Sequence, residues 1–134
     1  MLGIRESRRV NAVYNLTAED VISKRKFDDA IVRSNYPIDI HGRELNFGKI
    51  KMNTDERFYE VPFRSLISKD ILNLLVAGRC AGFDFTAQSA VRVQTTCMAM
   101  GEACAHASAM SIKGNIPLKE IDGKKLKSIM IDFD

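Results

Sequence analysis

The sequence predicts an α/β fold, with α+β as the alternative, and three observations lead to this prediction. Residues 71–79, ILNLLVAGR, hold an almost unbroken apolar run, which is typical of a parallel strand covered on both faces. Residues 89–114 follow as a long segment rich in alanine and methionine, and its end at Lys113 and Gly114 is typical of a helix C-terminus. Shorter extended and helical segments precede both in the first half of the chain.

The first half begins with a predicted strand and a short predicted helix. Residues 3–14, GIRESRRVNAVY, alternate β-branched and polar side chains in part, which predicts a strand with an irregular start. Residues 16–27, LTAEDVISKRKF, predict a helix, because Thr17 can serve as the N-cap and Asp20 stands three positions later, close to a capping box.

The remaining elements are short. Residues 28–42, DDAIVRSNYPIDIHG, predict extended structure, and Pro37 places a strand end or a sheet edge there. Residues 43–63 carry scattered turn formers around two short extended pieces, which predicts a hairpin or an excursion. Residues 117–134 predict a short amphipathic helix with Leu126 on its apolar side.

Composition excludes several classes of protein. The 134 residues are 46% hydrophobic and 28% charged, which suits a single globular domain. No apolar run approaches the roughly 20 residues that cross a bilayer, and the first ten residues lack the apolar stretch of a signal peptide, so we expect a cytoplasmic protein without a membrane partner. The net charge of +3 and the acidic neighbours of the basic clusters at 5–9 and 24–26 argue against nucleic acid as a partner. The histidines and cysteines lack metal-ligand spacing, so we expect no metal site.

Two cysteines lie on the helix predicted at 89–114. Cys97 and Cys104 are seven residues apart, about 10 Å along a helix axis, so a disulfide between them is excluded. The start of a helix lowers the pKa of a thiol, which would favour redox activity at Cys97. The absence of a neighbouring cysteine favours the alternative, a buried and unreactive thiol.

The same helix carries small residues at every fourth position, in the rows Gly101, Ala105, Ala109 and Ala99, Ala103, Ala107. A glycine inside a helix costs about 1 kcal/mol relative to alanine. Close approach of another backbone or of a planar ligand would offset that cost. Packing of the helix against a sheet also explains the pattern, and on the pattern alone we favour this explanation.

Four blocks of the sequence resemble a known family. NLLVAGR at 73–79 and RVQTTCMAMGEACAHA at 92–107, preceded by VPFRSLI at 61–67, resemble the C-terminal part of bacterial FAD-dependent oxidoreductases of the glutathione-reductase-like superfamily. The segments at 2–21 and 27–42 resemble the part of those enzymes that precedes it. The blocks occur in the family's order and extend from residue 2 to about residue 131.

The resemblance implies two regions and a chemistry. Residues 1–70 would form part of a substrate or cap region, and residues 71–134 the returning strand and the helices that complete a Rossmann-like FAD-binding domain. The chemistry implied is transfer of a hydride from a small-molecule substrate to FAD, with the cofactor carrying the reaction. In this region His41 is a weak catalytic candidate, because Asp39 lies two residues away and could orient its ring.

The resemblance also implies cofactor-binding residues. The helix that opens near Arg92 would direct its N-terminus at the flavin, with backbone donors from Thr95, Thr96 and Cys97. Gly78 would let the backbone pass close to the ribityl chain. Arg79 stands where many relatives carry aspartate, and it would serve the phosphates or a substrate carboxylate. A cation at Arg92 opposes the dipole of the following helix, which calls for an anionic cofactor or substrate group.

One motif of the family is missing from these 134 residues. The ADP half of FAD is bound by a G-x-G-x-x-G turn between a strand and a helix, and Gly3, Gly42 and Gly48, the only glycines before Gly78, lack that spacing. We therefore expect a C-terminal fragment of a flavoenzyme that is inactive alone and depends on a missing N-terminal FAD-binding segment or on self-association. The alternative is a non-catalytic oligomerising or interaction domain derived from such an enzyme.

Overall fold

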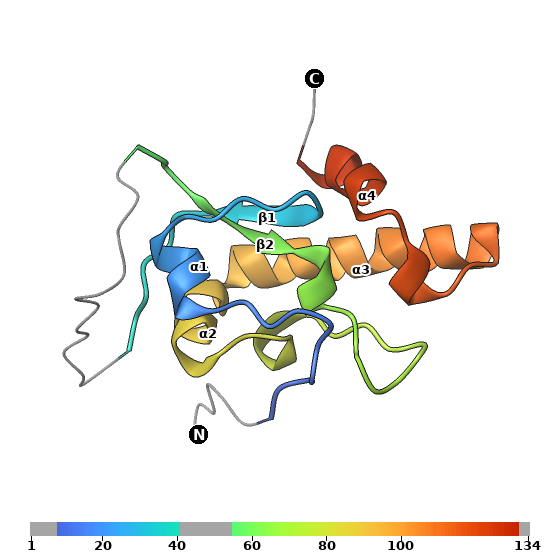
Figure 1. Cartoon of the computed structure of the whole chain (residues 1–134), viewed down its shortest axis with the longest axis horizontal. Coiled ribbons are helices and arrows are strands. Elements are labelled where there is room, and N and C mark those ends of the chain that lie inside the picture. The colour runs from blue at the N-terminus through green and yellow to red at the C-terminus, as the bar shows by residue number, and fades with distance from the viewer. Residues whose placement is uncertain (1–7, 41–54, 132–134) are drawn as a thin grey trace.

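The computed structural model describes residues 8–40 and 55–131. Its elements follow one another as helix α1 (Ala18–Ile22), strands β1 (Ala30–Ser34) and β2 (Tyr59–Pro62), and helices α2 (Phe85–Val91), α3 (Gln94–Gly114) and α4 (Gly123–Met130), as Figure 1 shows. Three short 3-10 turns lie between them, namely η1 (Phe63–Ser65), η2 (Gly78–Cys80) and η3 (Leu118–Glu120). The mixture of helices and strands agrees with the predicted α/β class at this coarse level.

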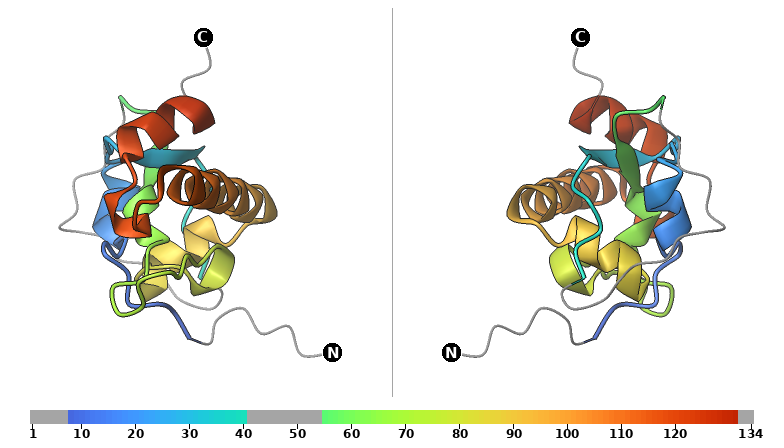
Figure 2. Two further views of the ribbon diagram at one scale, coloured as in Figure 1. Left: turned by 90° about the vertical axis from the view of Figure 1, so that its right-hand side faces the viewer. Right: turned by 90° about the vertical axis from the view of Figure 1, so that its left-hand side faces the viewer.

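The sheet consists of β1 and β2, which pair antiparallel with Val32 opposite Val61 and Ser34 opposite Tyr59. Helices α3 and α4 both contact β1, and the end-on views place the strand between them (Figure 2). Buried apolar side chains from all these elements meet in one core, whose largest fully buried members include Leu16, Ile31, Val61, Phe63, Met100 and Leu126. The core therefore joins segments from both halves of the chain, while the predicted division at residue 70 stays a prediction.

Helix α1 begins where the sequence predicts. The Asp20 N–H donates to Thr17 Oγ1 over 3.3 Å, and the Thr17 N–H donates to Asp20 Oδ2 over 3.0 Å, which completes a capping box. The prediction of a short helix capped by Thr17 is thus confirmed. Helix α4 likewise falls inside the predicted range 117–134 and buries Leu126 completely.

Two predicted strands are wrong for the described residues. Residues 71–79 form no strand, because no parallel strand lies beside them among the described residues. Their β-type pairing is an isolated bridge between Leu75 and Ile67. Ile71 and Leu72 are 55% and 69% exposed. Residues 8–14 of the first predicted strand also run as irregular chain, joined to the core by a bridge of Ala12 to Ser68. The strand at 71–79 was predicted from its apolar composition alone, and that composition does not distinguish a buried strand from this irregular segment.

The long helix predicted over 89–114 is broken. Arg92 forms the C-cap of α2, and Val93 adopts extended angles (φ −75°, ψ 151°) before α3 starts. Helix α3 then runs to Gly114, its predicted end, where Asn115 takes the left-handed conformation (φ 49°). In the part of the chain with described coordinates, no helix combines the length and apolar character needed to cross a membrane.

Candidate functional site

A large cavity among the described residues lies at the start of α3. It has a volume of about 1070 Å³ and is open to solvent on one side. Its walls are β1 with the residues that follow it, the chain just before β2, the first turns of α3 and the last residues of α4. This size is at the upper end of that of small-molecule pockets, roughly 300–1,000 Å³.

The N-terminus of α3 supplies hydrogen-bond donors to this cavity. The N–H groups of Gln94, Thr95 and Thr96 precede the first intrahelical bond, which runs from the Cys97 N–H to the Val93 carbonyl over 3.0 Å. Val93 is the N-cap residue, and its apolar side chain cannot accept a hydrogen bond. Because α3 is 21 residues long, its start carries a partial positive charge that attracts anions.

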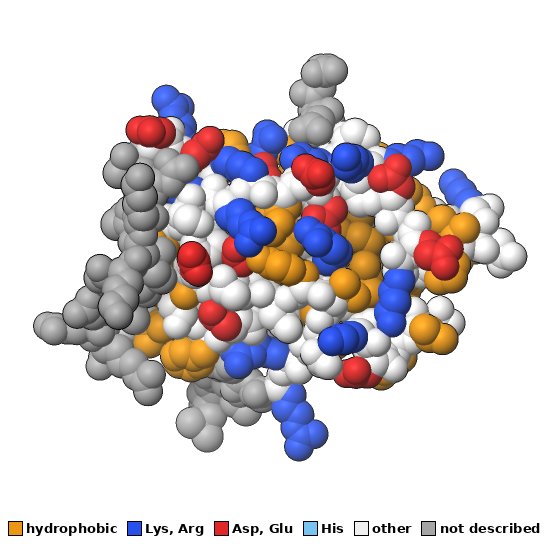
Figure 3. All heavy atoms as spheres, in the orientation of Figure 1, with side chains coloured by type: hydrophobic (Ala, Val, Ile, Leu, Met, Phe, Trp, Pro, Cys, Tyr) orange, Lys and Arg blue, Asp and Glu red, His pale blue; other side chains and the backbone are white. Residues whose placement is uncertain are grey.

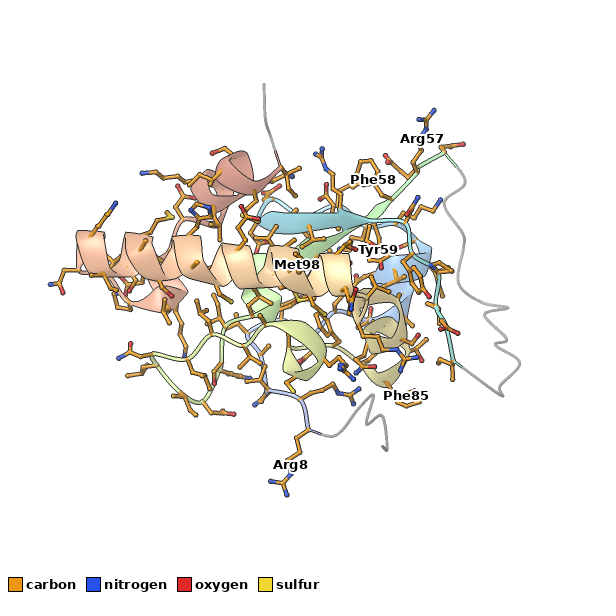
Figure 4. All side chains as sticks on the ribbon, turned by 180° about the vertical axis from the view of Figure 1, so that it is seen from behind. Arg8, Arg57, Phe58, Tyr59, Phe85 and Met98 are labelled. Carbon is orange, nitrogen blue, oxygen red and sulfur yellow. The ribbon has the colours of Figure 1, made fainter. Side chains whose placement is uncertain are left out.

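Three arginines add positive charge to the same walls. Arg33, Arg57 and Arg92 line the cavity together with one carboxylate, Glu102. Arg33 is in part neutralised by the buried carboxylate of Glu60, which lies 3.3 Å from its Nε atom. Arg57, at the start of the β2 segment, extends outward from the body of the molecule in Figure 4. The cavity as a whole therefore favours an anionic ligand.

Arg92 lies at the junction of α2 and α3, which the sequence did not predict. Its Nη2 donates to the Asp39 carbonyl over 2.9 Å, and it caps the C-terminus of α2, where a cation is favourable. The expectation that Arg92 opposes a helix dipole is therefore incomplete, because the break at Val93 gives it a second helix end to stabilise. Arg92 nevertheless lines the cavity together with Thr95 and Thr96.

The other three predicted cofactor residues lie on the adjacent side of the start of α3. Gly78 has a φ of +81°, a conformation that strongly favours glycine, and a Cβ at this position would lie 3.8 Å from Cys97 Sγ. Burial raises the pKa of the Cys97 thiol, and the charge of Arg79 offsets part of that increase. Cys97 is therefore a poor thiolate nucleophile, which agrees with the favoured prediction of an unreactive thiol.

The structure thus places all six predicted cofactor-binding residues near the start of α3, in two groups on different sides of that helix. Arg92, Thr95 and Thr96 line the cavity, whereas Gly78, Arg79 and Cys97 belong to the contact between η2 and α3. The weak catalytic candidate, His41, lies outside the described residues. Its neighbour Asp39 is placed beside α2 by a backbone N–H bond to Ser89 Oγ of 3.2 Å.

Sequence reasoning missed the strand side of the cavity. Phe58 stands next to Arg57 and is flanked by two cations, Lys26 Nζ at 3.7 Å and the Arg33 guanidinium carbon at 5.1 Å from its ring centre. Arg33 is the first exposed residue after the buried residues Ala30–Val32, but only the pairing of β1 with β2 sets it beside Phe58. On the face shown in Figure 3, basic and acidic side chains are interspersed.

The described residues contain no group of three or more histidine, cysteine or acidic side chains arranged to hold a metal ion. Comparison with known proteins adds one finding. Residues 1–130 match the family model described as FAD dependent oxidoreductase. No curated protein and no solved structure matches the chain.

Proposed function

The chain belongs to the FAD-dependent oxidoreductase family, and we propose that it supplies the flavin side of an FAD site at the cavity beside the start of α3. The observation that carries this proposal is the uncapped N-terminus of a 21-residue helix in a cavity lined by three arginines and one carboxylate. Such an arrangement stabilises negative charge.

The residues present fit a flavin chemically. The pyrimidine edge of the ring becomes electron-rich on reduction, and the N–H groups of Thr95 and Thr96 are donors suited to it. Arg92 would hold an anionic group of the cofactor or substrate through its planar guanidinium. When bound, FAD would supply the hydride-accepting ring, and the protein would orient the small-molecule substrate against it and provide the electrostatic field.

Gly78 and Arg79 have a supporting role in this proposal. The positive φ of Gly78 shapes the η2 turn that packs against the first turn of α3. Substitution of this glycine would strain the turn and shift the helix start rather than remove a ligand contact. Arg79, on the same turn, adds positive charge beside Cys97, since it lowers the pKa of that thiol against the effect of burial.

The ADP half of FAD needs a partner in this proposal. These 134 residues contain no G-x-G-x-x-G turn, so a Rossmann-like segment outside them would bind the pyrophosphate. The chain then acts as part of a flavoenzyme, and we expect it to bind isolated flavin weakly and to show no turnover alone.

Flavin titration tests the proposal directly. The probe is FMN, which carries the flavin without the ADP half, and the measurement is quenching of its fluorescence at flavin concentrations up to about 1 mM, the range of weak binding. We expect saturable binding that FAD competes for and ADP does not. An unsaturable signal throughout that range would overturn the proposal.

Variants locate the flavin on the molecule. Arg92→Ala and Arg57→Ala should each weaken FMN binding by about tenfold, which corresponds to the loss of roughly 1.4 kcal/mol from a charge-assisted contact. The matched control is Lys125→Ala, which removes a cation from the exposed side of α4, away from the cavity, and should leave binding unchanged. Equal binding by all three variants would place the flavin elsewhere.

A further inference from the structure

Helix α3 has an uncovered apolar side. We define its outer face as the residues that share the solvent side of the helix, namely Met98, Gly101, Ala105, Ala109 and Ile112, all of which are exposed. Met98 and Ile112 are 73% and 80% exposed, unusually high for large apolar side chains. Met98 projects from the side of α3 that Figure 4 presents to the viewer.

Nothing within the described residues accounts for the glycine on this face. A Cβ added at Gly101 would have no heavy atom of the described residues within 4 Å, so their packing does not require a glycine there. Glycine inside a helix is nevertheless less stable than alanine. With Ala105 and Ala109 it leaves a shallow surface on which the backbone of a second helix could approach closely.

The outer face is symmetric about Ala105. Gly101 and Ala109 stand four residues before and after it, and Met98 and Ile112 stand seven residues before and after it. An antiparallel copy of α3, related by a two-fold axis at Ala105, would therefore set Met98 of each copy against Ile112 of the other and small residues against small residues. Self-complementarity of this kind is what a two-fold interface requires.

The charges along one rim of the face are complementary in the same arrangement. Glu102 and Lys113 are both exposed and lie on the same side of the outer face. In the antiparallel pair, the rise of 1.5 Å per residue puts Glu102 of one copy about 7–8 Å along the axis from Lys113 of the other, within reach of these long side chains. The two-fold axis repeats this pair, so two opposite-charge contacts flank the apolar centre.

We propose that two copies of this chain associate through the outer faces of α3, antiparallel and centred on Ala105. A groove of about 700 Å³ next to Ile112, lined also by Leu72, Ser108 and Ile116, extends the apolar surface at the end where Met98 of the other copy arrives. One pair of helices, even with the two rim contacts and the groove, buries less surface area than a standard protein–protein interface. The dimer should therefore be weak, and its population should depend on the protein concentration. The inference does not rest on flavin binding, although Glu102 at the rim of this face also lines the cavity.

The first test measures oligomeric state. Sedimentation velocity between about 1 and 100 µM should show the wild-type chain passing from monomer to dimer. Ala105→Glu would set two carboxylates against each other at the axis and should leave a monomer throughout, whereas Ser128→Glu, which adds the same charge to an exposed position of α4, should dimerise like the wild type. A monomeric wild-type chain at 100 µM, or a dimer that persists in Ala105→Glu, would overturn the proposal. Circular dichroism melts confirm that each variant is folded.

The second test fixes the register. Glu102→Lys and Lys113→Glu should each weaken the dimer several-fold, because each replaces two opposite-charge contacts by like-charge ones. The double variant restores both pairs with their signs exchanged, so its dissociation constant should return toward that of the wild-type chain. If the double variant is as weak as the single variants, the antiparallel register is wrong.

Discussion

The two sides of α3 are built from nearly the same residue types and lie in opposite environments. On the inner side Met100, Ala103 and Ala107 are completely buried against the core, whereas on the outer face Met98 is 73% exposed and Ala105 is exposed with it. Helical periodicity determines which residues share a side, and contact with β1 determines which side is covered. The difference teaches that small and apolar residues along a helix do not by themselves identify the side that packs.

The largest effect should come from truncating the inner side. Met100→Ala leaves a cavity in the core, and we expect it to lower the free energy of unfolding by about 2–5 kcal/mol. Met98→Ala makes the same chemical change on the outer face and should alter that free energy by no more than about 0.5 kcal/mol. Urea denaturation at about 1 µM, where the chain should be monomeric, measures both. Equal losses of unfolding free energy in the two variants would contradict the assignment of a buried inner side and an exposed outer face to α3.

A smaller effect of opposite sign should come from filling the outer face. Gly101→Ala adds a methyl group that meets nothing and improves helix propensity, so it should stabilise the fold by up to about 1 kcal/mol. Gly123→Ala is the contrasting variant, because its Cβ would lie 2.5 Å from the Cβ of Asp29. It should destabilise the fold, and a thermal melt that ranks the two variants the other way would contradict the packing.

The smallest change is chemical and leaves the fold intact. Burial raises the pKa of the Cys104 thiol to about 11 and also raises that of Cys97, whereas Cys80 is exposed. At pH 8 a thiol reagent should therefore modify Cys80 first and the two α3 cysteines much more slowly. Cys80→Ser should abolish the fast phase, and its survival in that variant would mean that α3 opens readily.

The same raised pKa values give stability a pH dependence. Below the pKa of an unfolded thiol, near 9, both states keep Cys104 protonated and its contribution is constant. Above that pH the unfolded chain loses its proton first, so stability should fall until the pH reaches about 11. Replacing Cys104 by alanine should flatten the loss over this range of pH.

Local chemistry was readable from the sequence where neighbours along the chain decide the outcome. The Thr17 and Asp20 capping box and the end of α3 at Gly114 depend on residues within a few positions of one another. The apolar run at 71–79 was misread, because burial of a strand requires a neighbouring strand that lies far away in the sequence or outside it. The break at Arg92 and Val93 was missed because both residues are compatible with a helix.

The candidate site divides in the same way. The family resemblance placed a helix N-terminus near Arg92 to Thr96, and the orphan N–H groups of any helix start make it suited to an anion. Arg33, Arg57 and Phe58 joined that terminus only through the pairing of β1 with β2 and the packing of α3 beside them.

The sequence by itself determined the start of α1 and the end of α3, which rest on local hydrogen bonding, and four of its blocks carried the family resemblance. Only the tertiary structure decided which side of α3 is buried, which cations line the cavity with Arg92, and that the apolar residues Ile71 and Leu72 stay exposed. The physical reason is the distance along the chain over which each interaction acts. Capping and periodicity act within a few residues, whereas burial and charge clustering depend on contacts between segments distant along the chain.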